Sequence, residues 1–581
     1  MTKTLQADNH LTRRSLLGGA LTLGGGAAIA AAAPLASTTT TAPAAAAHAR
    51  PIQITASAAM NNVETDSGKV YGSSRDGVIS FRGIPYAAST EGANRFLPPQ
   101  KPEPWTGIRS ALYWGWVCPQ TYNSSASGLR VGWTHDDESF MFEWEDGKPS
   151  EDCLRLNVWT PGLDNKKRAI LFWIHGGGMT SGSAYELHSY DGENLAHEMD
   201  VVVVSVNHRL GVLGFLNLSE YGDQYASSGN VSMLDIIEAL KWVQTNIANF
   251  GGDPGRVMIF GQSGGGSKVG TIMGMPAANG LFHRASIQSG SGLRQATMES
   301  SQKLAQATLA ELGITKTNIG KLQTDFTFRQ LVEAGMAAQR KAAAGNAPVV
   351  SGGRGGGWGP VVDGNLIPRH TWDPAAPDSS ATVPLMVGTV LNEMFNSVQM
   401  GDASLEAMDM TEAKRRLTPL MGSHTDHVVE VAQELYPKAT PFEIFSLASA
   451  MRQRLNAYTQ AALKTKQGGA PAYLYRSEWQ SPLCDGRARA FHTSELPFCF
   501  HNVEQCAKLV GNTPESHLLA GRVAGAWAAF AKTGNPNHAG IPKWESYNDK
   551  VPTMVFDKVC ALKNDPDGDL RKAILETVAL D

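Results

Sequence analysis

Short runs of almost purely apolar residues recur along the chain, and turn residues follow most of them. The segments 169–174 and 201–206 are two clear examples. A strand that is buried on both faces has this pattern, because neither face presents side chains to water. Shorter runs of the same kind occupy residues 257–260, 285–288, 383–390 and 472–475. The pattern therefore predicts a largely parallel sheet.

Residues 232–250, between two of these runs, change to helical spacing. The apolar positions of this segment form one stripe along a helix: Met233, Ile236, Ile237, Leu240, Val243 and Ile247. Strands that alternate with helices indicate an α/β fold. Two further segments, 295–350 and 404–466, have helical patterns without comparable strands, and we expect them to be helical insertions. The glycine-rich segment 351–359 is predicted to be a flexible loop.

Composition and charge narrow the class of protein. The 581 residues are 42% hydrophobic and 18% charged, as in globular proteins, and their net charge is −4. Such a charge offers no basic surface for nucleic acid. Past the N-terminal region no apolar run approaches the roughly 18 residues of a membrane span, so no stable membrane insertion is expected. We found no internal repeat and no long linker, which favours one large domain over residues 50–581.

Residues 1–49 differ from the rest of the chain. Arg13 and Arg14 stand directly before a stretch of Leu, Gly and Ala, and the small residues around His48 suit a cleavage site. This arrangement is typical of a twin-arginine signal peptide followed by an alanine-rich leader. We therefore expect export by the twin-arginine machinery to a periplasmic or extracellular location. The alternative interpretation is a disordered, low-complexity leader.

The cysteines do not indicate a metal site. There are six of them, and none forms a C-x-x-C pair or a His/Cys cluster with zinc spacing. We expect neither a metal nor an organic cofactor. An oxidising destination permits disulfides, although a protein exported in the folded state must first tolerate reduced thiols.

Two glycine-rich turns follow predicted strands and carry the chemistry of acyl transfer. Ser263 lies in a G-x-S-x-G turn after residues 257–260, where a strand-to-helix junction exposes a serine hydroxyl. Residues 175–178 read His-Gly-Gly-Gly and follow residues 169–174. Such a turn can present consecutive N–H groups to an oxyanion. In a chain with 60 glycines, either motif alone could also be a simple turn.

A serine nucleophile needs a base and an acid that orients the base, in the chain order nucleophile, acid, base. His492 lies after Ser263, between polar turn residues and an apolar stretch, and is the most suggestive histidine in that part of the chain. Glu393 follows the strand predicted at 383–390, which places it at the same sheet edge as Ser263. By position alone, each could equally be an ordinary loop residue.

Longer segments of the chain resemble a known family. Residues 151–159 (EDCLRLNVW), 207–211 (NHRLG) and 249–254 (NFGGDP) match its motifs in the right order, and the resemblance runs from about residue 83 to 536. The chain resembles the type-B carboxylesterases. The resemblance implies an α/β-hydrolase fold, with a mostly parallel central sheet flanked by helices and with helical insertions.

The resemblance also implies roles for particular residues. Ser263 would be the nucleophile, His492 the general base and Glu393 its orienting acid. The oxyanion donors would be Gly177, Gly178 and Gly264, and the disulfide would join Cys118 and Cys153. The implied activity is hydrolysis of small carboxylic esters through an acyl-enzyme on Ser263. An amidase, carbamate hydrolase or lactonase with the same triad, or a non-catalytic binding member of the fold, are the alternatives.

The chain departs from the family pattern at several positions around this site. Gln262 stands where Glu is usual before the nucleophile, and Gly264 stands where Ala is usual after it. Asn392 and Met394 flank Glu393 where Asp and Gly are common. We expect Gln262 to alter the electrostatics of the site, and Gly264 to keep the backbone donor while loosening the turn.

Aromatic residues near 139–144 and Trp358 are further residues that could line a substrate cleft. Packing or loop positions are equally compatible with their sequence context.

Overall fold

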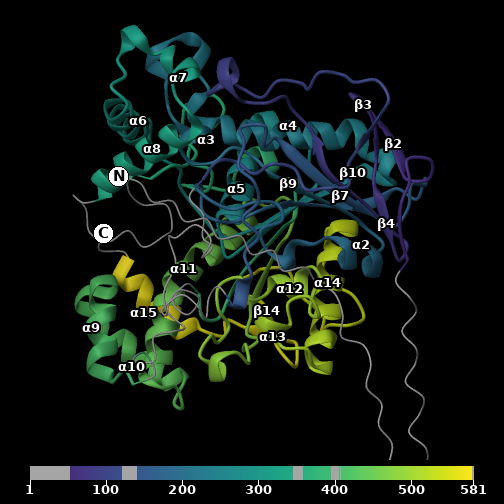
Figure 1. The fold of residues 1–581 in the computed structure, drawn as a ribbon. Helices are drawn as coiled ribbons and strands as arrows, with labels where there is room; N and C mark the ends of the chain where they lie inside the picture. Colours follow the sequence, from purple (N-terminus) through teal and green to yellow (C-terminus); the bar gives the residue numbers. More distant parts are fainter. Residues whose placement is uncertain (1–52, 121–139, 344–356, 394–404, 406, 579–581) are drawn as a thin grey trace, which may run out of the picture. The chain divides into compact units, whose positions relative to one another are not determined.

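The computed structural model describes residues 53–120, 140–343, 357–393, 405 and 407–578 (Figure 1). The predicted signal peptide and leader, most of the predicted glycine-rich loop 351–359, and Met394 lie outside these residues.

A 12-stranded mixed sheet is the centre of the fold. Its strands, in sheet order, are β1 (Ile54–Ala56), β4 (Ser73–Arg75), β5 (Val78–Pro85), β7 (Arg155–Thr160), β9 (Val202–Val206), β8 (Arg168–Ile174), β10 (Gly252–Gln262), β11 (Arg284–Gln288), β12 (Leu385–Val390), β13 (Ala472–Ser477), β14 (Pro552–Phe556) and β15 (Ala561–Asn564). The strands from β9 to β14 in this order pair in parallel, and the flanking pairs are antiparallel.

The apolar runs of the sequence correspond to the parallel strands. The predicted segments 169–174, 201–206, 257–260 and 472–475 lie on β8, β9, β10 and β13. Every residue of β8, β9 and β12 is buried, which is the burial that their almost purely apolar runs predicted. β10 begins earlier than predicted, and its pairing with β8 is irregular between Gly252 and Val257.

A second sheet was not predicted. It has three short strands, β2 (Asn62–Thr65), β3 (Gly68–Tyr71) and β6 (Ile108–Ser110). The strands have three or four residues each, and all of β6 is exposed. They therefore lack the apolar runs that marked the main sheet.

Some helices pack around the sheet, and others form the insertions beside it (Figure 1). The helices around the sheet are α2 (Glu193–Met199), α3 (Gly211–Phe215), α4 (Val231–Asn246), α5 (Gly264–Ile272), α12 (Leu496–Cys499), α13 (Ala507–Val510) and α14 (Pro514–Thr533). The predicted insertions contain α6 (Met298–Glu311), α7 (Lys321–Thr324) and α8 (Phe328–Ala343), then α9 (Met410–Met421), α10 (Thr425–Leu435) and α11 (Pro441–Lys466), and α15 (Gly568–Val578) packs against α10 and α11.

Alternate residues of the central strands point to opposite faces of the sheet, as the pleat requires. On β8, Ile170, Phe172 and Ile174 join the apolar cluster that includes the α4 residues. Leu171 and Trp173 join the cluster that includes the α14 residues. The sheet therefore has one core on each face, which is why its strands are apolar at consecutive positions.

In the described part of the chain, no helix combines the length and the apolar character needed to cross a membrane.

Candidate active site

The predicted site residues follow strands that end at one edge of the sheet. The glycine turn follows β8, Ser263 follows β10, and Glu393 lies three residues after β12. These strands run parallel within the sheet order β8-β10-β11-β12, so their carboxyl ends lie on the same side. Ligand sites in parallel sheets form at this edge.

Ser263 sits on a strained turn between β10 and α5. Its backbone has φ 57° and ψ −124°, a conformation that a side chain rarely adopts. Its N–H donates to the Gln288 carbonyl at 2.8 Å. Glycines are needed on both sides, because a Cβ at Gly261 would lie 2.6 Å from the Gly265 backbone. The turn leaves the Ser263 side chain half-buried while its neighbours are buried.

The His-Gly-Gly-Gly turn lies directly against Ser263. A Cβ at Gly176 would come within 3.5 Å of the Ser263 Cβ, and one at Gly264 would collide with the Gly178 carbonyl. Gly177 and Gly178 have φ of 74° and 60°, which glycine adopts without strain. In the described part of the chain, no protein group accepts from the N–H groups of Gly177, Gly178 or Gly264. The structure therefore brings the three predicted oxyanion donors together, with their N–H groups unused.

The carbonyl groups of this turn are held by other groups. The Gly176 oxygen is 3.1 Å from the His175 Nδ1 atom. The Gly177 oxygen accepts from the Ser181 N–H at 3.1 Å and from the Ser181 hydroxyl at 3.0 Å. Each of these carbonyls belongs to the same peptide as one of the N–H groups. Because the peptide is planar, holding the carbonyl orients the donor.

Glu393 and His492 are in direct contact. The Glu393 Oε2 atom is 2.5 Å from the His492 Nδ1 atom, and both side chains are buried. Their neighbours Asn392 and Phe491 form an isolated parallel bridge, which places the two side chains next to each other. The other carboxylate oxygen of Glu393 accepts from the Val390 N–H at 3.1 Å. Burial opposes protonation of His492, but the charge and hydrogen bond of Glu393 outweigh it and raise the pKa of His492.

Gln262 lies against the face of the imidazole. Its amide nitrogen is 3.1 Å from the His492 Nε2 atom and 3.4 Å from the Nδ1 atom. Because the amide is nearly equidistant from the two ring nitrogens, it does not lie along the lone pair of Nε2, which stays available to take a proton. Among the described contacts, His492 makes no hydrogen bond to the Ser263 hydroxyl. The departure at position 262 therefore touches the base directly, through the face of its ring.

Glu495 is a carboxyl group near the site that the sequence analysis did not single out. It is three residues after His492, its side chain is 2% exposed, and neither oxygen has a hydrogen-bond partner among the described residues. Burial and then the charge of Glu393 raise the pKa of Glu495 to about 7. Its spacing from His492 was the available signal, but many surface carboxylates share such a spacing.

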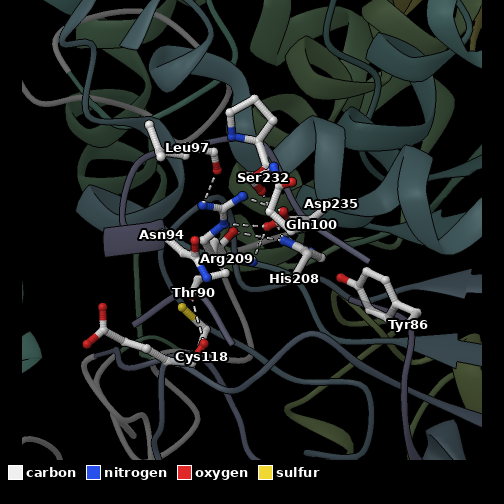
Figure 2. Close-up of polar contacts among 12 residues, drawn as sticks. Tyr86, Thr90, Asn94, Leu97, Gln100, Cys118, His208, Arg209, Ser232 and Asp235 are labelled. Carbon is white, nitrogen blue, oxygen red and sulfur yellow. Dashed lines mark hydrogen bonds and ion pairs between the residues drawn. The ribbon is translucent and has the colours of Figure 1, made fainter. Parts of the chain in front are cut away.

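A buried ion pair stabilises the segment around Arg209, which contacts the end of the glycine turn. Figure 2 shows the Arg209 guanidinium between the Leu97 carbonyl and the Asp235 carboxylate. The closest Arg209–Asp235 contact is 2.6 Å, and both side chains are almost fully buried. Next to this segment, the Gly211 N–H donates to the Met179 carbonyl at 2.8 Å. The ion pair thus anchors residues that hold the end of the glycine turn.

The two cysteines of the predicted disulfide are free and buried in the structure. The Cys118 sulfur accepts from the Leu210 N–H at 3.2 Å. A hydrogen bond with Cys118 and then burial raise the pKa of Cys153 well above its ordinary value. The two thiols are therefore neighbours, but the predicted bridge is not formed in this structure.

The aromatic residues singled out in the sequence have different positions. Trp358 is buried and lines a cavity of about 150 Å³ next to Thr180, together with Leu210, Val212, Val332 and Met336. Phe142 packs edge-on against Phe491 at a ring distance of 5.9 Å. Phe140 is 57% exposed. Within the described residues, no group of three or more His, Cys, Asp or Glu side chains is arranged to hold a metal ion.

The chain is similar in sequence to known esterases and hydrolases. The chain matches the carboxylesterase family over residues 59–564. It is 33% identical to the para-nitrobenzyl esterase of Bacillus subtilis strain 168 over 518 residues, which cover 88% of this chain and 98% of that protein. It is 31% identical to the phenmedipham hydrolase of Pseudarthrobacter oxydans, over 84% of this chain and 94% of that protein.

Solved structures show the same relationship. An esterase from Clostridium hathewayi that can hydrolyse aliphatic aromatic polyesters has a TM-score of 0.77 and 35% identity, and covers 90% of this chain and 100% of its own. The carboxylesterase EST55 of Geobacillus stearothermophilus has a TM-score of 0.71 and 33% identity, over 88% of this chain and 99% of its own. The chain therefore belongs to the carboxylesterase family, and it is a carboxylic ester hydrolase with the α/β-hydrolase fold.

Proposed function

We propose that Ser263, His492 and Glu393 form the catalytic triad of this esterase, with the N–H groups of Gly177, Gly178 and Gly264 as its oxyanion hole. The observation that carries the proposal is the contact of 2.5 Å between Glu393 and His492, at the sheet edge where the glycine turn meets Ser263. A carboxylate on Nδ1 fixes the imidazole tautomer that leaves Nε2 free to take a proton.

Hydrolysis then proceeds in two steps. His492 takes the hydroxyl proton of Ser263 while the serine oxygen bonds to the ester carbonyl carbon, and the three N–H groups bind the oxyanion. The C–O bond to the alcohol breaks as His492 returns the proton to the leaving oxygen. Water then gives a proton to His492, attacks the acyl-enzyme and releases the acid, and the proton returns to Ser263.

Ser263 and His492 must form a hydrogen bond before the first step, because the described hydrogen bonds of His492 are to Glu393 and Gln262. Hydrogen bonds of an active site are often misaligned without substrate and tighten only when it binds. We infer that substrate binding brings the Ser263 hydroxyl to the Nε2 atom of His492.

The cavity beside Thr180 supports apolar esters of modest size. It is lined mainly by apolar side chains, and its volume of about 150 Å³ equals that of a cavity known to hold one benzene ring. Relatives of the chain are a para-nitrobenzyl esterase and an esterase acting on aliphatic aromatic polyesters. We propose that esters carrying an aromatic ring are substrates.

The decisive experiment is covalent labelling with a fluorophosphonate, which reacts with an activated serine. The parent enzyme is expected to label with one equivalent and lose activity, whereas Ser263→Ala neither labels nor turns over para-nitrophenyl acetate. Labelling of the Ser263→Ala variant, or its retention of activity, would exclude Ser263 as the nucleophile. Ser267→Ala, which removes a nearby serine of α5, is the matched control.

A substrate panel separates ester hydrolysis from the related reactions. An ester, an amide, a carbamate and a lactone with the same acyl group are compared by kcat/KM. We expect the ester to be preferred, and a higher value for any of the others would reassign the activity to that class.

We further propose that residues 1–49 direct export by the twin-arginine machinery. The paired arginines before an apolar stretch support this. Replacement of both Arg13 and Arg14 by lysine should retain the protein inside the native host, and unchanged export would contradict the proposal.

A further inference from the structure

Lys268 is a buried lysine next to the oxyanion turn. It lies on α5, five residues after Ser263, and its side chain is fully buried. Its Nζ donates to the His175 carbonyl at 3.1 Å. His175 is the first residue of the turn whose next residues carry the proposed oxyanion donors.

The face of α5 that carries Lys268 is the face that touches the turn. Gly264 and Gly265 lie four and three residues before Lys268, so all three share one side of the helix. A Cβ at Gly264 would collide with the Gly178 carbonyl, and one at Gly265 would collide with the Ile174 carbonyl. Glycines therefore let the first turn of α5 approach the loop closely, and Lys268 supplies the donor one helical turn further along.

Lys268 is surrounded by few groups that could carry charge. The rings of His175 and His208 stack with a centroid distance of 4.7 Å. Their Nε2 atoms have no partner among the described residues, and burial holds the pKa of each histidine well below its ordinary value. Glu186 is also buried and interacts electrostatically with Lys268, and its carboxylate accepts from the Tyr190 hydroxyl at 3.4 Å.

We propose that Lys268 is a positioning residue for ester hydrolysis: its protonated amine holds the His175 carbonyl and places a positive charge behind the oxyanion turn. The inference rests on the proposed roles of Ser263 and the glycine turn. The held peptide leads directly into Gly176, whose Cα lies close to Ser263. A cation at this place stabilises negative charge that develops on the other side of the turn, in a buried site where charges are weakly screened.

The proposal predicts a particular dependence on pH. Burial lowers the pKa of Lys268 to about 7, and burial raises the pKa of Glu186 to about 8. As pH rises through this range, Lys268 loses its positive charge and Glu186 gains a negative one. Both changes disfavour an oxyanion, so the electrostatic contribution of Lys268 is present at low pH and is lost as pH rises.

The test is the ratio of kcat between the parent enzyme and Lys268→Met, measured across pH. Methionine fills the space without a donor or a charge. Because the His492 titration is common to both proteins, the ratio isolates Lys268. We expect the variant to have a kcat about 10-fold lower near pH 7, since loss of a direct oxyanion donor costs about 10²–10³-fold. The ratio should then fall at alkaline pH to a smaller value, because the neutral amine still donates to the His175 carbonyl but no longer supplies a charge, with KM little changed.

A matched control is available in Lys464→Met. Lys464 is likewise buried and donates to the Ser380 and Ala381 carbonyls at 2.8 Å. It lies on α11, and its replacement should change stability and leave the pH profile of kcat as in the parent. Lys268→Gln, measured in the same way, replaces the methionine variant if that protein does not fold.

The kinetic comparison requires the fraction of intact active sites in each protein. Fluorophosphonate titration of Ser263 in every variant gives the fraction of intact sites and corrects kcat for misfolding. A parent-to-variant ratio that stays constant with pH, or a variant with full activity near pH 7, would overturn the role of Lys268. Retained activity in Ser263→Ala would instead overturn the proposed function itself.

Discussion

At the scale of single residues, the positions where this chain departs from the family pattern are also the positions that shape its site. Gln262 contacts the base, Gly264 admits the oxyanion turn, and Asn392 joins two segments that carry the triad. Gly264 also has a steric role, because the Gly178 carbonyl occupies the place of a Cβ at 264.

Replacing Gln262 by glutamate should move the acidic limb of the activity profile. His492 must be neutral to act as a base, and Glu393 already raises its pKa, so activity rises as pH passes through that raised value and is lost below it. A second carboxylate beside Nε2 favours the imidazolium further, and we expect the limb of kcat/KM to shift upward by on the order of one pH unit.

The uncharged Gln262→Met variant is the control for this shift. It removes the amide without adding charge, so its acidic limb should move upward much less than that of the glutamate variant. Identical limbs in the parent and in the glutamate variant would show that position 262 does not act on His492.

Replacing Gly264 by alanine should lower kcat strongly. The new Cβ collides with the Gly178 backbone, so the turn must move away from Ser263. Its N–H groups then no longer point at the oxyanion. We expect a loss of about 10²-fold in kcat, similar to removal of one oxyanion donor, with KM little affected. Steady-state kinetics with para-nitrophenyl acetate measure this.

Gly521→Ala provides a matched control, because that α14 glycine has open space around its Cβ position. It should keep full activity and gain about 1 kcal/mol of stability from the better helix propensity of alanine. Full activity in Gly264→Ala would contradict the close approach of turn and helix.

At the scale of elements, the triad depends on a link between the end of β12 and the segment after β13. The Asn392 N–H donates to the Ala490 carbonyl at 3.0 Å, and its side-chain nitrogen donates to the Ser446 hydroxyl of α11 at 3.1 Å. Asn392 thereby ties an insertion helix to the loop that carries His492.

Loss of this link should affect catalysis and stability together. We expect Asn392→Ala to lose about 1–3 kcal/mol of unfolding free energy, because buried polar partners are left unsatisfied. It should also lower kcat as the Glu393–His492 contact loosens. Denaturant unfolding and kinetics measure the two effects, and Ser446→Ala separates the helix contact from the bridge. A stable and fully active Asn392→Ala would show that the triad is held by β12 alone.

At the scale of the whole molecule, a bridge between Cys118 and Cys153 would act on the unfolded chain. The structure holds both as neighbouring thiols, so the bridge stays a prediction for the oxidised protein. Closing a loop of a few tens of residues is worth about 3–4 kcal/mol when it forms without strain.

The oxidised protein should therefore unfold at higher denaturant concentration than the reduced one, and Cys118→Ser should abolish the difference. Counting free thiols in denatured samples checks that the bridge has formed. An equal number of free thiols before and after reduction of the parent would refute it.

Local patterns of apolar and polar residues predicted much of the fold. The apolar runs at 169–174, 201–206 and 257–260 lie on buried parallel strands because a strand covered on both faces admits few polar residues. The short strands β2, β3 and β6 were not predicted, because they have no apolar runs and are defined by their pairing. The helical spacing of apolar residues predicted helices within 295–350 and 404–466. It did not predict which elements these helices pack against.

By itself the sequence determined the nucleophile turn, the glycine turn and the alternation of strands and helices, because these depend on residues close together in the chain. Only the tertiary structure shows that His492, which the family resemblance had pointed to, contacts Glu393, that Gln262 lies against the imidazole, and that Lys268 lies behind the oxyanion turn. Those contacts join residues far apart in sequence, and the distances between these residues depend on the order of the strands in the sheet. Local sequence motifs identify the reactive groups, and tertiary packing determines which groups they contact.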